Sequence, residues 1–127
     1  MDKTSSKKTV MVIDDSFTVR LVVKLALKNA GYNVIEAIDG KDAMYKLEGN
    51  KVNMFVCDVN MPNMDGITFV KNLRSIREYK FAPILMLTTE SAVSKMEEGR
   101  AVGVNSWMVK PFKPDQVLDA VSKLCRA

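Results

Sequence analysis

The sequence predicts an α/β protein built on a doubly wound, five-stranded parallel sheet, and two patterns carry that prediction. Short apolar runs, which suit strands buried on both faces, alternate with segments in which apolar residues recur every three or four positions. The alternation occurs five times, and no segment repeats. Right-handed crossovers then place five helices on the two faces of the sheet.

The strands are expected at about residues 9–14, 32–37, 54–57, 84–87 and 105–109. The first helix follows Ser16, which is a favourable N-cap residue, and closes at Gly31. A turn at Asp39-Gly40 opens a short second helix that ends near Gly49-Asn50.

The third helix begins after Asp65-Gly66, and its expected inward residues are Phe69, Val70, Leu73 and Ile76. The fourth helix, at 91–102, is weaker because Gly99 lies inside it, at a cost of about 1 kcal/mol relative to alanine. That weakness is either accidental or the mark of a movable element. Pro114 suits the first turn of the last helix.

Polar residues follow four of the apolar runs directly. Open α/β sheets place their ligands at the carboxyl ends of the strands, so neighbouring strands bring such side chains to one edge. These side chains are three carboxylates (Asp14, Asp15 and Asp58), a hydroxyl from Thr88 or Thr89, and the ammonium of Lys110. We predict that this group forms the functional site.

Three carboxylates close together either raise a pKa or recruit a cation. All-oxygen ligation completed by water favours Mg²⁺ or Mn²⁺ over zinc, and the backbone carbonyl of Asn60 is the simplest further ligand. The alternative is that Asp14-Asp15 only caps the first helix. Capping needs one residue of the pair, however, and leaves Asp58 unexplained.

Lys110 stands beside apolar neighbours at the end of its strand, where it either extends to water or holds an anion as a fixed charge. With a hydroxyl from Thr88 or Thr89, it fits a phosphoryl group carried on Asp58. Carboxylate nucleophiles do form aspartyl phosphates, mainly through positioning and charge neutralisation.

Length and composition indicate one globular domain of 127 residues with a net charge of +4. The basic surface is either ordinary solvated charge or a bias towards acidic protein partners. Nucleic acid is disfavoured because no long basic run is interleaved with aromatic residues. The absence of histidine excludes Ser-His-Asp triads and histidine-ligated zinc.

Cys57 and Cys125 lack metal-ligand spacing, and Cys57 lies in an apolar strand, so we expect reduced thiols in the cytoplasm. Residues 1–7 are polar and are expected to be disordered, ahead of a single domain at 8–127. No apolar stretch suits a signal peptide or a membrane span, so no membrane partner is expected.

The motifs make the chain resemble the response-regulator receiver domain, over about residues 8–125. They are Asp14-Asp15, Asp58, the Asn-Met-Pro-Asn-Met-Asp-Gly loop at 60–66, Thr88 and Lys110-Pro111-Phe112. Stand-alone CheY-like chemotaxis regulators are the most similar members. The resemblance implies their flavodoxin-like strand order, 2-1-3-4-5.

The resemblance also implies a role for each site residue. Asp58 is the phosphoacceptor, Thr88 the switch hydroxyl and Lys110 the phosphate-binding ammonium. Asp15, Asp58 and the Asn60 carbonyl bind Mg²⁺, or Mn²⁺ in its place, while Asp14 acts largely through water. A cis peptide bond precedes Pro111, and the switch or modulating positions are Thr89, Glu90, Trp107 and Pro111.

Trp107 departs from the common pattern of the family, in which Tyr or Phe is the switch aromatic. An indole is larger and has no phenolic hydroxyl, so the usual inward and outward movement of the ring is in doubt. The alternative is a tryptophan that simply fills a surface groove.

The resulting hypothesis is a cytoplasmic, monomeric switch that is not a turnover enzyme. A chemotaxis-type histidine kinase phosphorylates Asp58, and a phosphatase is a further partner. The fourth helix, fifth strand and fifth helix then bind a target such as the flagellar motor switch protein, through a face made basic by Lys95, Arg100, Lys113 and Lys123. A phosphate sink or a relay intermediate has the same site residues.

Two other classes of protein compete with this hypothesis. A flavodoxin-type electron carrier shares the topology, but three carboxylates would repel a flavin phosphate and no phosphate cradle follows the first strand. A phosphatase with an aspartyl nucleophile shares the intermediate, but it turns over small phosphoesters.

Overall fold

The computed structural model describes residues 7–89 and 94–125, and it contains one sheet of five parallel strands in the order β2-β1-β3-β4-β5. The strands are β1 (Thr9–Ile13), β2 (Asn33–Ala37), β3 (Met54–Asp58), β4 (Ile84–Thr88) and β5 (Ser106–Val109). The helices are α1 (Phe17–Asn29), α2 (Gly40–Leu47), α3 (Gly66–Arg74), α4 (Met96–Ala101) and α5 (Pro114–Leu124), with a 3-10 turn, η2, at Arg77–Tyr79. The predicted fold class and strand order are confirmed.

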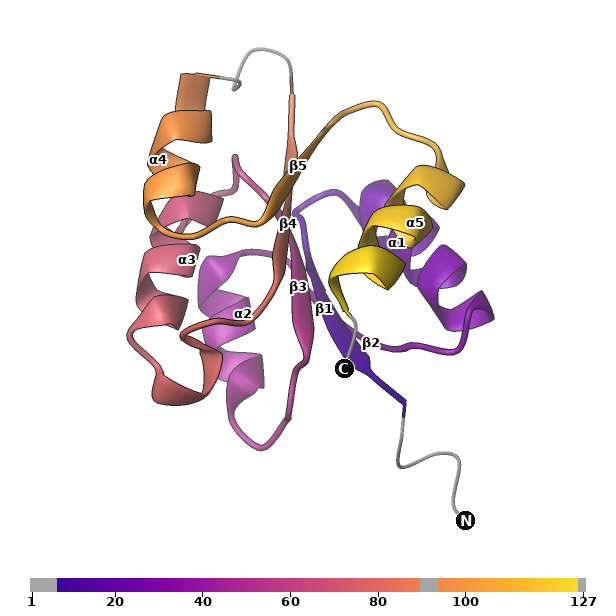
Figure 1. Ribbon diagram of the computed structural model, residues 1–127, viewed down its shortest axis with the longest axis horizontal. Coiled ribbons are helices and arrows are strands. Elements are labelled where there is room, and N and C mark those ends of the chain that lie inside the picture. Colours follow the sequence, from indigo (N-terminus) through magenta and orange to yellow (C-terminus); the bar gives the residue numbers. More distant parts are fainter. Residues whose placement is uncertain (1–6, 90–93, 126–127) are drawn as a thin grey trace.

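The sheet lies between two layers of helices, with α2, α3 and α4 on one side and α1 and α5 on the other (Figure 1). Every residue of β3 and β4 is buried, which explains why their sequences are apolar without alternation. On the α2–α4 side, the ring of Phe55 packs edge-on against the rings of Phe69 and Tyr79, at centroid distances of 5.8 and 5.5 Å. On the other side the core includes Val23 and Val117.

The register of the strands aligns their carboxyl ends along one edge of the sheet. Ile13 of β1 lies opposite Cys57 of β3, so Asp14 follows β1 at the level where Asp58 ends β3. Asp58 lies opposite Leu87, immediately before Thr88 at the end of β4. The fold therefore gathers the polar residues that follow the apolar runs.

Side-chain caps fix where three helices begin beside that edge. Ser16 accepts a hydrogen bond from the backbone N–H of Val19 at the start of α1, as predicted. Asp39 and Asp65 cap α2 and α3 in the same way. At the other end of α1, Gly31 has a φ of +96°, a conformation that glycine adopts without strain.

Two helices are shorter than the sequence predicts. Helix α3 ends at Arg74, so Ile76 packs against the core from outside the helix. Helix α4 begins at Met96 after a short 3-10 turn, and the first residues of the predicted 91–102 segment lie outside the described part of the chain. The expected disorder of residues 1–7 likewise concerns mostly residues that the structure does not describe, although Lys7 is described and exposed.

Gly99 has a packing role that explains its presence inside α4. The half-buried indole of Trp107 lies against the backbone of α4 at this residue. A Cβ at position 99 would lie 2.6 Å from Cη2 of Trp107, closer still to Cζ2, and 3.3 Å from Cδ1 of Ile67. The absence of a side chain at Gly99 therefore allows α4 and this tryptophan to pack together, at the cost of a lower helix propensity.

Both cysteines are free and buried, in agreement with the expectation of reduced thiols. Within the described ranges, no helix has both the length and the apolar character that crossing a bilayer requires.

The substitution Gly99→Ala is expected to displace the indole of Trp107 towards solvent. The added methyl group raises helix propensity, but the lost packing outweighs that gain and lowers the unfolding free energy by about 1 kcal/mol. Trp107 is the only tryptophan, so a red shift of its fluorescence emission and a urea denaturation curve report both effects.

The matched control is the double variant Gly99→Ala/Trp107→Tyr, in which the smaller ring leaves room for the methyl group. Its stability should exceed that of Gly99→Ala alone. A single Gly99→Ala variant with unchanged emission and undiminished stability would contradict the packing argument.

Candidate functional site

The three predicted carboxylates lie together at the carboxyl edge of the sheet. Asp14, Asp15 and Asp58 each offer an oxygen atom, and these atoms all lie within 4.8 Å of one another. The residue Asp14 is 0% exposed and Asp58 is 5% exposed, whereas Asp15 is exposed. Two of these negative charges are therefore largely removed from water, where their mutual repulsion is poorly screened.

Asp14 is held in place by contacts on several sides. One carboxylate oxygen accepts a hydrogen bond of 2.9 Å from the backbone N–H of Ser16, and its backbone carbonyl accepts one of 2.7 Å from Arg20. Its other carboxylate oxygen accepts a bond of 2.9 Å from Nζ of Lys110. Because Ser16 caps α1, the alternative that Asp14-Asp15 serves only as the cap is not needed.

Lys110 bridges two of the carboxylates. Its ammonium lies 2.9 Å from Asp14 Oδ2 and 3.2 Å from Asp58 Oδ1. The preceding strand, β5, brings it to the site, and its backbone N–H donates a 2.7 Å bond to the carbonyl of Thr88. The peptide bond to Pro111 is cis, as the resemblance implied. Lys110 is thus a fixed charge within the cluster and does not simply extend to water.

The charges of the cluster shift its pKa values. Burial, followed by the charge of Asp14, raises the pKa of Asp58 to about 6, and Lys110 opposes this rise. Burial opposes the charged form of Lys110, but its contacts with Asp14 and Asp58 outweigh burial and raise the pKa of the ammonium. At neutral pH the cluster therefore holds more negative charge than its one lysine neutralises.

That excess of negative charge fits a divalent cation. The available donors are oxygen atoms, which Mg²⁺ and Mn²⁺ prefer, and the described site contains no thiolate or imidazole donor at the cluster. Asn60 lies two residues beyond Asp58 in an exposed part of the loop, where its carbonyl is a candidate further ligand.

The predicted threonines lie on the neighbouring strand. Thr88 is fully buried at the end of β4, and its hydroxyl donates a 3.0 Å hydrogen bond to the carbonyl of Thr89. Thr89 is exposed. The predicted modulating residue Glu90 lies outside the described residues.

Sequence reasoning missed the contacts that order the loop between β3 and α3. Asn63 has a φ of +67°, and its Nδ2 donates a 2.8 Å hydrogen bond to a carboxylate oxygen of Asp39. Beneath the loop, the backbone N–H of Gly66 donates a 2.8 Å bond to the carbonyl of Val59, and a side chain at Gly66 would collide with the carbonyl of Asp58. Asp39 carried only a turn signal, and Asn63 carried none that distinguished it.

The face formed by α4, β5 and α5 is less basic than its sequence implies. Arg100 forms an ion pair with Glu97, and Lys123 forms one of 3.0 Å with Asp119. No described residue is ion-paired with Lys95 or Lys113, both of which are exposed. Glu98 of α4 and Asp115 of α5 likewise have no ion-pair partner among the described residues, so they offset the charge of these two lysines.

Known proteins share both the sequence pattern and the fold. PilG of Pseudomonas aeruginosa is 35% identical over 121 residues, which cover 95% of this chain and 90% of PilG. The chemotaxis protein CheY1 of Helicobacter pylori is 41% identical over 111 residues, covering 86% of this chain and 89% of CheY1. The structure of the chemotaxis protein CheY4 of Vibrio cholerae superimposes with a TM-score of 0.88 at 43% identity, over 94% of this chain and 99% of CheY4.

A family model agrees with these likenesses. The model described as the response regulator receiver domain matches residues 10–122, which include all the described residues of the carboxylate cluster and Lys110. The chain therefore belongs to the response regulator receiver domain family.

Proposed function

We propose that this receiver accepts a phosphoryl group on Asp58 from the phosphohistidine of a histidine kinase. The observation that supports the proposal best is the bridge that Lys110 makes between Asp14 and Asp58, at distances of 2.9 and 3.2 Å. It sets one fixed positive charge beside a buried, negatively charged nucleophile. A cluster of Asp14, Asp15 and Asp58 is typical of the Mg²⁺ site of receivers.

The transfer step exchanges one bond to phosphorus for another. A carboxylate oxygen of Asp58 forms the new bond, and the bond from phosphorus to the imidazole nitrogen of the kinase breaks. The imidazole keeps that electron pair and, with a proton on its other ring nitrogen, leaves as the neutral base. Lys110 and the backbone around Asp58 hold the phosphoryl oxygens in position. Asp15, Asp58 and the Asn60 carbonyl would hold Mg²⁺ or Mn²⁺, with Asp14 acting through water; bound there, the cation supplies further neutralisation of phosphoryl charge.

The proposed switch depends on Thr88. Its hydroxyl bonds to the carbonyl of Thr89, so reaching a phosphoryl group on Asp58 requires that bond to be exchanged. Such a movement lies next to β5, in which Trp107 packs against Gly99 of α4. Movement at Thr88 would thereby reach α4, β5 and α5, the face on which Lys95 and Lys113 are exposed. Thr89 and Pro111 flank this route, and we propose that they and Glu90 modulate it.

The proposed output is chemotaxis signalling from the cytoplasm by a monomeric receiver covering 8–127. Similarity to CheY1 and CheY4, whose names state chemotaxis, supports a chemotaxis-type kinase as the phosphoryl donor. The flagellar motor switch is the proposed first target and a phosphatase a further proposed partner. A phosphate sink or relay intermediate would have the same site residues and is the second candidate; PilG, whose name does not state chemotaxis, is also similar. In each case the chain catalyses only its own phosphorylation and dephosphorylation and is not a turnover enzyme.

The substitution Asp58→Asn is expected to abolish phosphorylation by a phosphorylated histidine phosphotransfer domain, because the amide is a poor nucleophile for this reaction. Transfer of radiolabelled phosphate in the presence of Mg²⁺ measures the effect. Asp65→Asn is the control, because Asp65 caps α3 within the same loop region and is absent from the cluster. Full labelling of the Asp58→Asn variant would remove Asp58 from the proposed role.

The same substitution is expected to stabilise the metal-free protein at pH 7. The pKa of Asp58 is about 6 in the folded state against an ordinary 3.8, so between these values the folded state binds more protons and stability falls as pH rises. Above pH 6 the full penalty applies, and Asp58→Asn should raise the unfolding free energy by about 1–3 kcal/mol. Towards pH 4 the difference should shrink.

Urea denaturation in EDTA at pH 4 and pH 7 tests this sign, again with Asp65→Asn as the control. Excess Mg²⁺ should stabilise the wild type more than the Asp58→Asn variant. A variant less stable than the wild type at pH 7 without metal would show that the charged form of Asp58 does not destabilise the fold.

The target is tested by affinity capture with the protein bound to beryllofluoride and Mg²⁺, a mimic of the phosphorylated state. A motor-switch output predicts a flagellar protein retained by the mimic and absent from the Asp58→Asn control. A sink predicts that the kinase alone is retained. Identical sets of proteins from both samples would contradict a phosphorylation-dependent output.

A further inference from the structure

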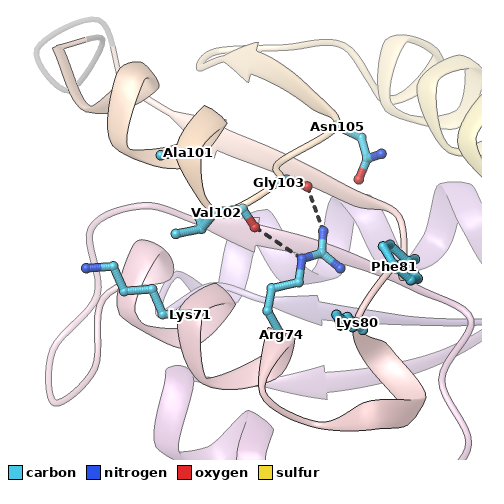
Figure 2. A pocket seen from close by; sticks show the side chains of 8 residues that line it. All are labelled: Lys71, Arg74, Lys80, Phe81, Ala101, Val102, Gly103 and Asn105. Atoms are coloured by element: carbon cyan, nitrogen blue, oxygen red, sulfur yellow. Dashed lines mark hydrogen bonds between the residues drawn. The ribbon is translucent and has the colours of Figure 1, made fainter.

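A cavity of about 490 Å³ opens at the end of the sheet opposite the carboxylate cluster. It lies between the end of α3, the segment after η2 and the loop that leads from α4 into β5 (Figure 2). We call it the basal cavity; its walls include Lys71, Arg74, Lys80, Phe81, Val102 and Gly103. None of these residues takes part in the proposed phosphoryl transfer.

The basal cavity carries uncompensated positive charge. Three of its lining residues are cationic, and none is acidic. Neither Lys71 nor Lys80 forms an ion pair with another described residue, and both are exposed. The third cation, Arg74, likewise has no carboxylate partner in the described part of the chain. This charge attracts an anionic group to the cavity.

Arg74 is held rigidly at the centre of the basal cavity. Its guanidinium donates to the carbonyls of Val102 at 3.2 Å and Gly103, and also to those of Tyr79 and Ala82. Figure 2 shows the first two of these bonds crossing from α3 to the loop after α4. Carbonyl partners fix the position of the guanidinium but leave its net charge intact, so a preorganised cation lines the cavity.

The rim of the basal cavity is apolar on one side. Phe81 is 86% exposed, the largest exposure among the large hydrophobic residues described, and Nζ of Lys80 lies 5.8 Å from the centre of its ring. Val102 adds an aliphatic surface. An inorganic anion would satisfy the lysines and leave this ring in water, whereas a polypeptide can place a carboxylate and a hydrophobic side chain side by side.

We propose that the basal cavity is a docking site for an acidic segment of a partner protein, with acidic side chains at Lys71 and Lys80 and a hydrophobic side chain on Phe81. The net charge of +4 disfavours a second copy of this chain as the occupant. One wall belongs to α3 and the other to the loop between α4 and β5, and the bonds of Arg74 to Val102 and Gly103 hold the two walls together.

The test uses the full chain and a fluorescein-labelled eight-residue peptide of alternating Glu and Leu. Fluorescence anisotropy measures its affinity, and amide shifts in NMR spectra locate it. Saturable binding should shift residues 71, 80–81 and 102–105. The variant Lys71→Glu/Lys80→Glu should bind at least about tenfold more weakly, because two attractive contacts become repulsive. The variant Phe81→Ser should also weaken binding while leaving the net charge unchanged.

The charge-matched control is Lys28→Glu/Lys41→Glu, which changes two exposed lysines on α1 and α2. Its binding should stay within about twofold of the wild type, because those lysines lie outside the cavity. Equal losses in the two double variants would overturn the proposal, as would absence of saturable binding. Equal affinity for a Glu-Ser peptide would also overturn it, because the site would then select charge alone.

The outcome is independent of the proposed phosphoryl transfer. The Asp58→Asn variant keeps the basal cavity and should bind the peptide in the absence of metal. Competition by ATP or inorganic phosphate at equal concentration would identify a small-anion site and overturn docking of a polypeptide. Shifts confined to α5 would do the same by placing the peptide on another face.

Discussion

The structure depends on holding three carboxylates together against their own repulsion. Lys110 provides the main opposing positive charge, because its ammonium lies between Asp14 and Asp58. It follows β5, which is two positions away from β3 in the sheet. The two ion pairs neutralise the charge of Lys110, but the three carboxylates together carry more negative charge than this one lysine can balance. An excess of this kind destabilises the fold and favours binding of a divalent cation, so the same feature serves binding at the expense of stability.

The scaffold around that cluster consists of elements that resist rearrangement. The central strands β3 and β4 are buried along their whole length, and capped helices begin beside the carboxyl edge. The loop after Asp58 is tied to the start of α2 by the bond between Asn63 and Asp39. By contrast, α4 spans only six residues and contains Gly99. The rigid central strands and the weaker helix α4 are thus connected through β4 and β5.

Sequence patterns predicted most of the fold and the position of the carboxylate cluster. The apolar runs located the strands, because strands buried on both faces consist of continuous apolar residues. The ends of these runs located Asp14, Asp58 and Lys110. Their proximity followed from a rule about parallel sheets. The strand order and the cis bond before Pro111 came from resemblance, since neither has a distinctive local signal.

Other features required three-dimensional contacts. The bond between Asp39 and Asn63 joins residues 24 positions apart, and no periodicity encodes it. The four carbonyl partners of Arg74 belong to segments whose paths cannot be predicted from sequence patterns. Gly99 was recognised as unfavourable for a helix, but its reason, the indole of Trp107, lies on a different element.

The fit between Gly99 and Trp107 bears on how receivers can be recombined. A chimera that imports α4 from a relative with a larger residue at this position, while keeping this β5, would confront the indole with a side chain. A chimera that imports only β5 from a relative with a smaller aromatic residue at position 107 would instead leave a void beside Gly99. The helix and the strand therefore constitute a single exchangeable module, and grafts that separate them should be judged first by whether these two residues travel together.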